Sequence, residues 1–123
     1  MNRTRMLLLA ACLGFSLQGM SQQVLEKDAA GDREYARVIR EYELGAPDRL
    51  LQLENYLELY PDSRYANRVE AMMGVCYFEE GKYPECIAML RSCDLELLPD
   101  EERDDCLMKL GTACLKTGNL KDA

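Results

Sequence analysis

The sequence predicts an all-α fold of antiparallel helix pairs, and two observations lead to this prediction. Apolar residues recur at three- and four-residue steps on both sides of a break at Gly81-Lys82, as on one face of a helix. A connection of two residues makes neighbouring helices antiparallel, so the two apolar stripes face each other. The pattern around Gly74 returns around Gly111, 37 residues later, which indicates a repeated helical hairpin. The stripes are Ala66, Val69, Met73, Cys76 and Tyr77 before the break, and Tyr83, Cys86, Ile87, Leu90 and Cys93 after it.

The first 21 residues are expected to be a signal peptide. A basic start with Arg3 and Arg5 precedes an apolar run of 12 residues, Met6–Leu17, and small residues stand at positions 19 and 21, just before Gln22. Twelve apolar residues are too few to cross a bilayer, which takes about 20. We therefore expect an exported protein whose mature form begins at Gln22.

Two alternatives remain open for this start of the chain. The residues Leu9-Ala10-Ala11-Cys12 resemble a lipobox, and a lipid on Cys12 would associate the protein with a membrane. That reading leaves only Met6–Ala11 as the hydrophobic core of the signal, which is shorter than the usual minimum of about 7 residues. The second alternative is an uncleaved anchor.

Residues 22–31 are predicted to be a spacer or a frayed first turn, and residues 32–61 a first helix pair. Asp32 is expected to N-cap the first helix, a Gly-Ala-Pro-Asp break follows at positions 45–48, and Pro61 stops the second helix. This pair lacks the glycine signature of the later hairpin, as expected of a unit that caps the end of an array. The apolar positions are Tyr35, Val38, Ile39 and Tyr42, then Leu50, Leu53, Leu57 and Tyr60.

The rest of the chain is predicted to hold a full helix pair over residues 62–98 and an incomplete pair over residues 99–123. Asp62 or Ser63 is expected to cap the first helix of the full pair. Asn119 is expected to cap a last helix that stops after about one turn. Because that apolar stripe is begun and not completed, we expect the chain to be a fragment of a longer array.

The repeated pattern resembles the tetratricopeptide repeat family, whose units of about 34 residues run W-x2-L-G-x2-Y, then A-x3-F, then P. Glu70 and Leu107 stand in place of the tryptophan, and the period is three residues longer. The run Leu59–Ala66 is most similar to exported bacterial members such as outer-membrane assembly lipoproteins. The resemblance implies a short α-solenoid of about two and a half repeats. The matching positions are Met73-Gly74-x2-Tyr77, Cys86-x3-Leu90 and Pro99, then Leu110-Gly111-x2-Cys114 and Ala123.

In that family the first helix of each pair lines a concave surface that binds peptides or partner helices. The resemblance therefore implies an apolar groove with scattered charges, suited to an apolar segment of another protein, with Phe78 as its aromatic anchor. The cochaperone branch grips a carboxylate with Lys and Asn, and that clamp is absent because Ala71, Val75, Met108 and Thr112 occupy its places. Packing against a neighbouring helix is the alternative role for some of these side chains. The implied groove residues are Arg68, Ala71, Val75, Phe78, Glu79, Asp105, Met108, Thr112, Leu115 and Lys116.

Composition and charge exclude several function classes. The 123 residues include no histidine, which is the side chain most used for proton transfer near neutral pH and the commonest metal ligand. Loss of the two arginines of the signal takes the formal net charge from −7 to −9, and such a surface repels nucleic acid. The acidic run over residues 94–105 fits a solvated helix start better than a catalytic carboxylate pair. We therefore expect no catalytic residue, no metal and no cofactor.

The cysteines after the signal are Cys76, Cys86, Cys93, Cys106 and Cys114. We expect buried free thiols, which behave as small hydrophobic side chains. Cys86 and Cys93 are seven residues apart on one helix, about 10.5 Å along its axis, and a disulfide needs Cα atoms within about 7 Å. One bridge between adjacent helices, such as Cys93 to Cys106, remains open.

These observations predict a noncatalytic scaffold that binds other proteins or peptides in the bacterial cell envelope, in the periplasm or at the periphery of the outer membrane. One alternative is the extracytoplasmic input region of a membrane sensor. Another is the repeat region of an envelope enzyme whose catalytic domain lies beyond residue 123.

Overall fold

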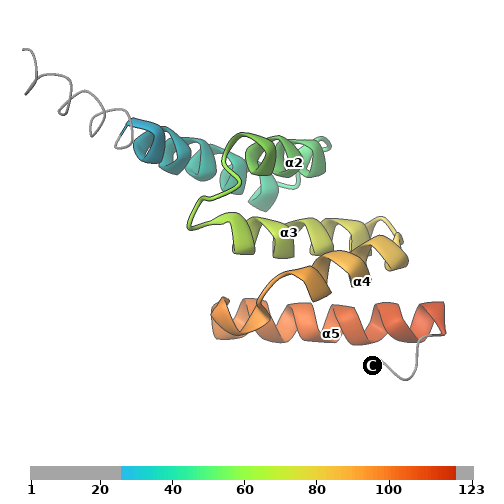
Figure 1. Ribbon diagram of the computed structural model, residues 1–123. Coiled ribbons are helices and arrows are strands. Elements are labelled where there is room, and N and C mark those ends of the chain that lie inside the picture. The colour runs from blue at the N-terminus through green and yellow to red at the C-terminus, as the bar shows by residue number, and fades with distance from the viewer. Residues whose placement is uncertain (1–25, 119–123) are drawn as a thin grey trace, which may run out of the picture. The chain divides into compact units, whose positions relative to one another are not determined.

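The computed structural model describes residues 26–118, and these residues form helices with no strand among them (Figure 1). A first helix covers residues 26–43. It is followed by α2 (Arg49–Leu59), α3 (Ala66–Glu79), α4 (Tyr83–Ser92), the short 3-10 helix η1 (Leu95–Leu97) and α5 (Asp100–Thr117). The predicted all-α class is confirmed. The chain divides into two units, residues 1–34 and 35–123, and the helices α2 to α5 belong to the second unit.

Three predicted features lie outside the described residues. They are the signal peptide at residues 1–21, the alternative lipid site at Cys12 and the last helix expected from Asn119.

The first helix starts earlier than predicted. It is already formed at residue 26, so residues 26–31 are helical rather than part of a spacer, and Asp32 lies inside the helix rather than at its N-cap. Glu26 and Lys27 are good helix formers, and Gly31 costs only about 1 kcal/mol relative to alanine. Helix propensity therefore outweighs the lack of a clear apolar pattern.

The third helix also starts at a different place from the predicted cap. α3 begins at Ala66, and its cap position makes no side-chain hydrogen bond. The predicted cap Ser63 stabilises the preceding turn instead, because its Oγ accepts a hydrogen bond from the backbone N–H of Tyr65 at 3.0 Å. The same Oγ lies 2.5 Å from the hydroxyl of Tyr56, which is 1% exposed and needs a polar partner. Ser63 therefore ties α2 to this turn.

The predicted break between α3 and α4 at Gly81-Lys82 is confirmed. Gly81 has a φ of 75°, and its N–H donates to the carbonyl of Phe78 at 3.0 Å, while the N–H of Lys82 donates to the carbonyl of Tyr77 at 2.8 Å. This pair of hydrogen bonds is the Schellman motif, which requires a left-handed residue that glycine adopts without steric cost. α4 then begins with Pro84 in its first turn, where a missing N–H does no harm.

α3 is the central helix of the second unit and is buried on two faces. Its neighbours are α2, α4 and α5. Of the predicted stripe, Val69, Met73 and Cys76 are buried, whereas Ala66 and Tyr77 are partly exposed. Ala71 and Val75 lie on a second face, and they are only 3% and 8% exposed because they pack in one cluster with side chains of α4 and α5.

Gly74 lets α4 approach α3 closely. A Cβ atom at this position would lie 2.5 Å from Cδ2 and 2.7 Å from Cγ of Leu90, far inside the ordinary contact distance of about 3.5–4.0 Å. The sequence predicts that Gly74 faces the second helix of its hairpin near Cys86. Gly74 does face α4, and the contact is with Leu90, one turn beyond Cys86.

Candidate partner-binding pocket

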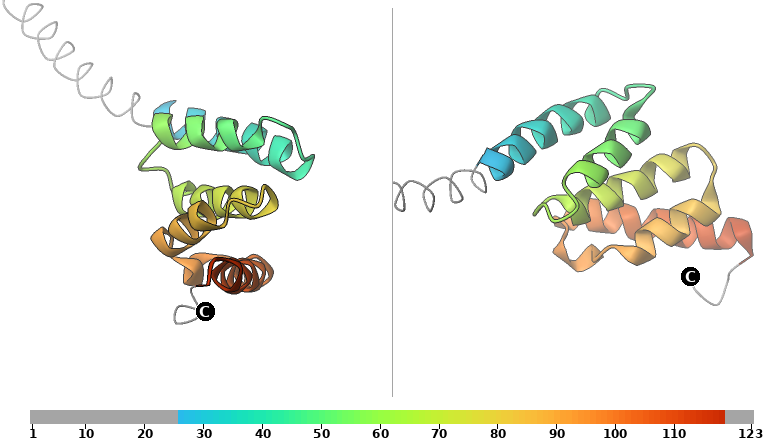
Figure 2. Two further views of the ribbon diagram at one scale, coloured as in Figure 1. Left: turned by 90° about the vertical axis from the view of Figure 1, so that its right-hand side faces the viewer. Right: turned by 45° about the horizontal axis from the view of Figure 1, so that its top comes forward.

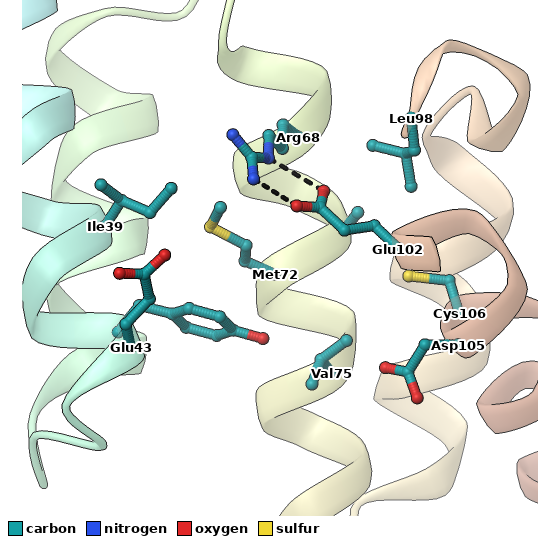
Figure 3. A pocket seen from close by; sticks show the side chains of 11 residues that line it. Ile39, Glu43, Arg68, Met72, Val75, Leu98, Glu102, Asp105 and Cys106 are labelled. Atoms are coloured by element: carbon teal, nitrogen blue, oxygen red, sulfur yellow. Dashed lines mark hydrogen bonds and ion pairs between the residues drawn. The ribbon is translucent and has the colours of Figure 1, made fainter. Parts of the chain in front are cut away.

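A pocket opens in the second unit between the C-terminal part of the 26–43 helix, α3 and the start of α5 (Figure 3). Its volume is about 100 Å³, whereas small-molecule sites have roughly 300–1,000 Å³. The pocket therefore has room for one side chain rather than for a cofactor. The lining residues are Ile39, Tyr42, Glu43, Arg68, Ala71, Met72, Val75, Leu98, Glu102, Asp105 and Cys106.

An ion pair joins α3 to α5 in the pocket wall (Figure 3). Arg68 Nε donates to Glu102 Oε2 at 2.9 Å, and Arg68 Nη2 pairs with Glu102 Oε1. Arg68 Nη1 also donates to the hydroxyl of Tyr35 at 2.7 Å. The hydrogen bond to Glu102 raises the pKa of Arg68. Both side chains are about a third exposed, so the pair contributes about 0–1 kcal/mol to stability, but its two-pronged geometry aligns α3 with α5.

Apolar side chains line most of the remaining wall. Met72 and Val75 come from α3, Leu98 precedes α5, and all three are at most 8% exposed. Ile39 completes this surface from the first helix. An apolar side chain that binds in this pocket is removed from water. This burial favours binding by about 25 cal/mol of free energy per Å² of apolar area.

Carboxylates outnumber cations around the pocket. Glu43, Glu102 and Asp105 accompany one cation, Arg68, so the lining carries a net charge of −2 at neutral pH. Glu102 is paired with Arg68, and Asp105 Oδ1 lies 2.5 Å from Nζ of Lys109. Glu43 has no ion pair among the described residues. The pocket therefore favours a cationic group beside an apolar one.

Tyr42 adds a hydroxyl that stays protonated at neutral pH. Burial raises the pKa of Tyr42 to about 12, and the neighbouring thiols of Cys76 and Cys106 and the carboxylate of Asp105 act in the same direction. The guanidinium of Arg49, 5.4 Å from the ring centroid, offsets this only in part. The hydroxyl can therefore both donate and accept a hydrogen bond from a bound group.

Four of the ten predicted groove residues line this pocket. They are Arg68, Ala71, Val75 and Asp105. Ala71 and Val75 are also core residues, so they form part of the wall rather than an exposed surface.

Phe78 and Glu79, at the end of α3, do not line the pocket. Phe78 is half-buried, because its ring meets Tyr83 edge-on at 5.7 Å between centroids and Nζ of Lys109 lies 5.7 Å from its centroid. It is therefore partly covered, in contrast to the freely exposed anchor expected from the sequence. Glu79 forms an ion pair with Arg49 of α2.

The last four predicted residues lie on α5 and also stand apart from the pocket. Met108 and Leu115 are 63% and 60% exposed, and Lys116 is exposed as well. Thr112 is half-buried and donates its hydroxyl to the carbonyl of Met108 at 2.9 Å. These side chains belong to a separate surface of α5.

Sequence reasoning missed the part of the pocket that the first helix supplies. Ile39 and Tyr42 belong to the apolar stripe predicted for that helix. Extending the groove prediction to the first helix of all three expected pairs would have identified Ile39 and Tyr42 as groove residues, together with the neighbouring Glu43. Glu102 and Cys106 carry no local signal, because only packing brings the start of α5 beside α3.

Within residues 26–118, no group of three or more metal-ligating side chains is placed to hold an ion, and no helix is long and apolar enough to cross a membrane. Comparisons of the chain with protein-family models, with curated proteins and with solved structures find no match.

Proposed function

We propose that the chain is a noncatalytic, tetratricopeptide-like binding protein of the bacterial cell envelope, and that its pocket receives an apolar side chain of another protein. The observation that carries this proposal is the origin of the pocket walls. Apart from Leu98, they come from the 26–43 helix, α3 and α5, which are the first helices of the three expected pairs. In the family that the sequence resembles, first helices line the concave binding surface.

The lining favours one kind of partner segment. Met72 and Val75 offer an apolar wall to the side chain that enters. The net charge of −2 around that wall, with Glu43 free of an ion pair, favours a lysine or arginine next to the apolar residue. A side chain that fills a desolvated pocket is a typical hot spot, whose truncation to alanine costs about 2 kcal/mol or more.

The envelope location rests on the predicted signal peptide. Intact-mass measurement of periplasmic protein should give a chain that begins at Gln22. A lipid adduct on Cys12 would instead place the protein at a membrane surface.

Peptides with a central leucine test the pocket directly. One fluorescent peptide carries lysines on both sides of the leucine, and the other carries glutamates. We expect the lysine peptide to bind up to about fivefold more tightly, because an exposed ion pair is worth up to about 1 kcal/mol and about 1.4 kcal/mol corresponds to tenfold. Glu43→Lys brings the net charge of the lining from −2 to 0 and should abolish this preference.

Glu58→Lys is the matched control. Glu58 is an exposed carboxylate on α2 that does not line the pocket, so its replacement makes the same change in net charge elsewhere. The control should keep the preference of the wild type. If Glu43→Lys and Glu58→Lys behave alike, or if neither peptide binds, the pocket is not the partner site.

A further inference from the structure

Four cysteines gather between α4 and α5. Cys86 lies on α4 and Cys93 at its C-terminal end, while Cys106 and Cys114 lie on α5. All four belong to one buried cluster, are at most 9% exposed and are free thiols. Cys76 on α3 belongs to the other buried cluster, where it is the one cysteine among the described residues.

The spacing of these cysteines matches an antiparallel pair of helices. α4 and α5 run in opposite directions (Figure 1, Figure 2). Cys93 comes seven residues after Cys86, and Cys106 comes eight residues before Cys114. Arg91 of α4 donates to Sγ of Cys114 at 3.7 Å, so Cys114 faces α4. Because the helices are antiparallel, the start of α4 lies towards the end of α5, which brings Cys86 towards Cys114 and Cys93 towards Cys106.

The pKa values of the thiols agree with these pairings. Burial raises the pKa of Cys86 to about 11, and Cys114 raises it further. Burial also raises the pKa of Cys106 to about 11, with added contributions from Asp105 and then from Cys93. A charge shifts the pKa of a group that lies close to it, so Cys114 lies near Cys86 and Cys93 lies near Cys106 within the buried cluster that all four share.

We propose that α4 and α5 carry two disulfide sites, Cys86–Cys114 and Cys93–Cys106, which close on oxidation and cross-link the two helices. Packed helices have axes about 8–10 Å apart, and each Cα lies about 2.3 Å from its axis. Facing Cα atoms are therefore about 3.5–5.5 Å apart before any stagger along the axes is added. Disulfides form at Cα separations of about 4.4–6.8 Å, a range that overlaps the general spacing of facing residues on packed helices such as α4 and α5. This inference does not depend on the proposed function.

Closure of each site requires an oxidant that carries a disulfide, such as oxidised glutathione. One cysteine loses its proton, attacks the S–S bond of the oxidant and releases one reduced glutathione, which leaves a mixed disulfide. The facing cysteine then loses its proton, attacks that mixed disulfide and releases the second reduced glutathione. Each protein site gives up two electrons and two protons, and the two sulfurs of the oxidant take them up.

One of the two sites adjoins the pocket. Cys106 lines the pocket together with Glu102 and Asp105, which lie within one turn of it on α5. A bridge from Cys106 to Cys93 fixes this turn to the end of α4. The redox state of Cys93 and Cys106 would therefore determine how far the turn of α5 that lines the pocket can move relative to α4.

Peptide mapping of the folded full chain tests the assignment. The protein is equilibrated with oxidised glutathione and its intact mass is measured. Its remaining thiols are then alkylated after unfolding, and the cross-linked peptides are mapped. We expect a loss of about 2 Da for each bridge and about 4 Da in total, with Cys86 linked to Cys114 and Cys93 linked to Cys106. Cys76 should be recovered alkylated. The oxidised protein should melt at a higher temperature than the reduced protein, because cross-links restrict the unfolded chain.

Variants separate the two sites. Cys93→Ala should lose one bridge and keep the Cys86–Cys114 bridge, whereas the matched control Cys76→Ala should keep both. Any other pairing of the four cysteines, or no loss of mass in protein that circular dichroism shows to be helical, overturns the proposal. The map of the wild type decides the pairing, so a variant that does not fold leaves the test intact.

Discussion

Alanine should change stability in opposite directions at Gly74 and Gly111, although these glycines hold equivalent places 37 residues apart. A Cβ at Gly74 would lie 2.5 Å and 2.7 Å from side-chain atoms of Leu90 and 3.6 Å from its backbone nitrogen. A Cβ at Gly111 would have no such neighbour within 4 Å. The same substitution therefore meets a packed side chain in α3 and open space in α5.

Two opposing effects set the change in the free energy of unfolding of each variant. In either helix, alanine is favoured over glycine by about 1 kcal/mol. Nothing opposes this gain at Gly111, so the free energy of unfolding should rise by about that amount. Leu90 is 1% exposed and cannot move aside without disturbing the core, and overpacking of this kind costs about 1–3 kcal/mol. Gly74→Ala should therefore lose about 0–2 kcal/mol, and the two variants should differ by about 1–3 kcal/mol.

Urea denaturation followed by far-UV circular dichroism measures both variants. In thermal melting, each kcal/mol corresponds to about 4–8 °C for a folded region of this size. A Leu90→Ala background removes the obstructing side chain, and Gly74→Ala should become stabilising there. If the two glycine variants shift stability equally, or if Gly74→Ala still destabilises the Leu90→Ala protein, close approach of α4 does not explain Gly74.

Alkaline pH should weaken the fold, because burial raises the pKa of Cys86, Cys93 and Cys106 from 9.0 to about 11. The contribution of these three neutral thiols to stability is complete below about pH 9 and is lost as the pH rises towards about 11. Urea titrations at several pH values measure this loss. Unchanged stability across that interval would contradict the prediction. Phe78→Ala should destabilise the protein by about 1–3 kcal/mol, less than the 3–5 kcal/mol of a fully buried ring, because Phe78 is half-buried against Tyr83. It should leave binding of the lysine peptide unchanged, and lost binding at an unchanged melting temperature would make Phe78 the exposed anchor after all.

Local sequence signals predict the helices and most of their breaks. α2 covers Arg49–Leu59, close to the interval that the break at positions 45–48 and Pro61 define. Gly81 ends α3 because the Schellman motif needs a left-handed residue at that position. These features depend on residues that are close together in the chain, so the sequence is sufficient for them.

The sequence predicts helix starts less well, because a polar side chain can bond to more than one partner. Ser63 has the chemistry of an N-cap, but a buried hydroxyl on Tyr56 and the N–H of Tyr65 compete for its oxygen. Asp32 is likewise a good cap, yet favourable helix formers before it extend the helix to residue 26. The outcome depends on neighbours that a motif does not include.

The site depends most on packing between distant segments. Ala71 and Met108 are equivalent by the 37-residue offset, yet Ala71 is 3% exposed and Met108 is 63% exposed. The reason is that α3 has neighbours on two faces, whereas the face of α5 that bears Met108 has none among the described residues. Transfer of groove positions from one helix to the next therefore mixed core residues with surface residues. Arg68 and Asp105 are also equivalent by that offset, and both line the pocket, because their turns stand where the first helix, α3 and α5 leave a gap.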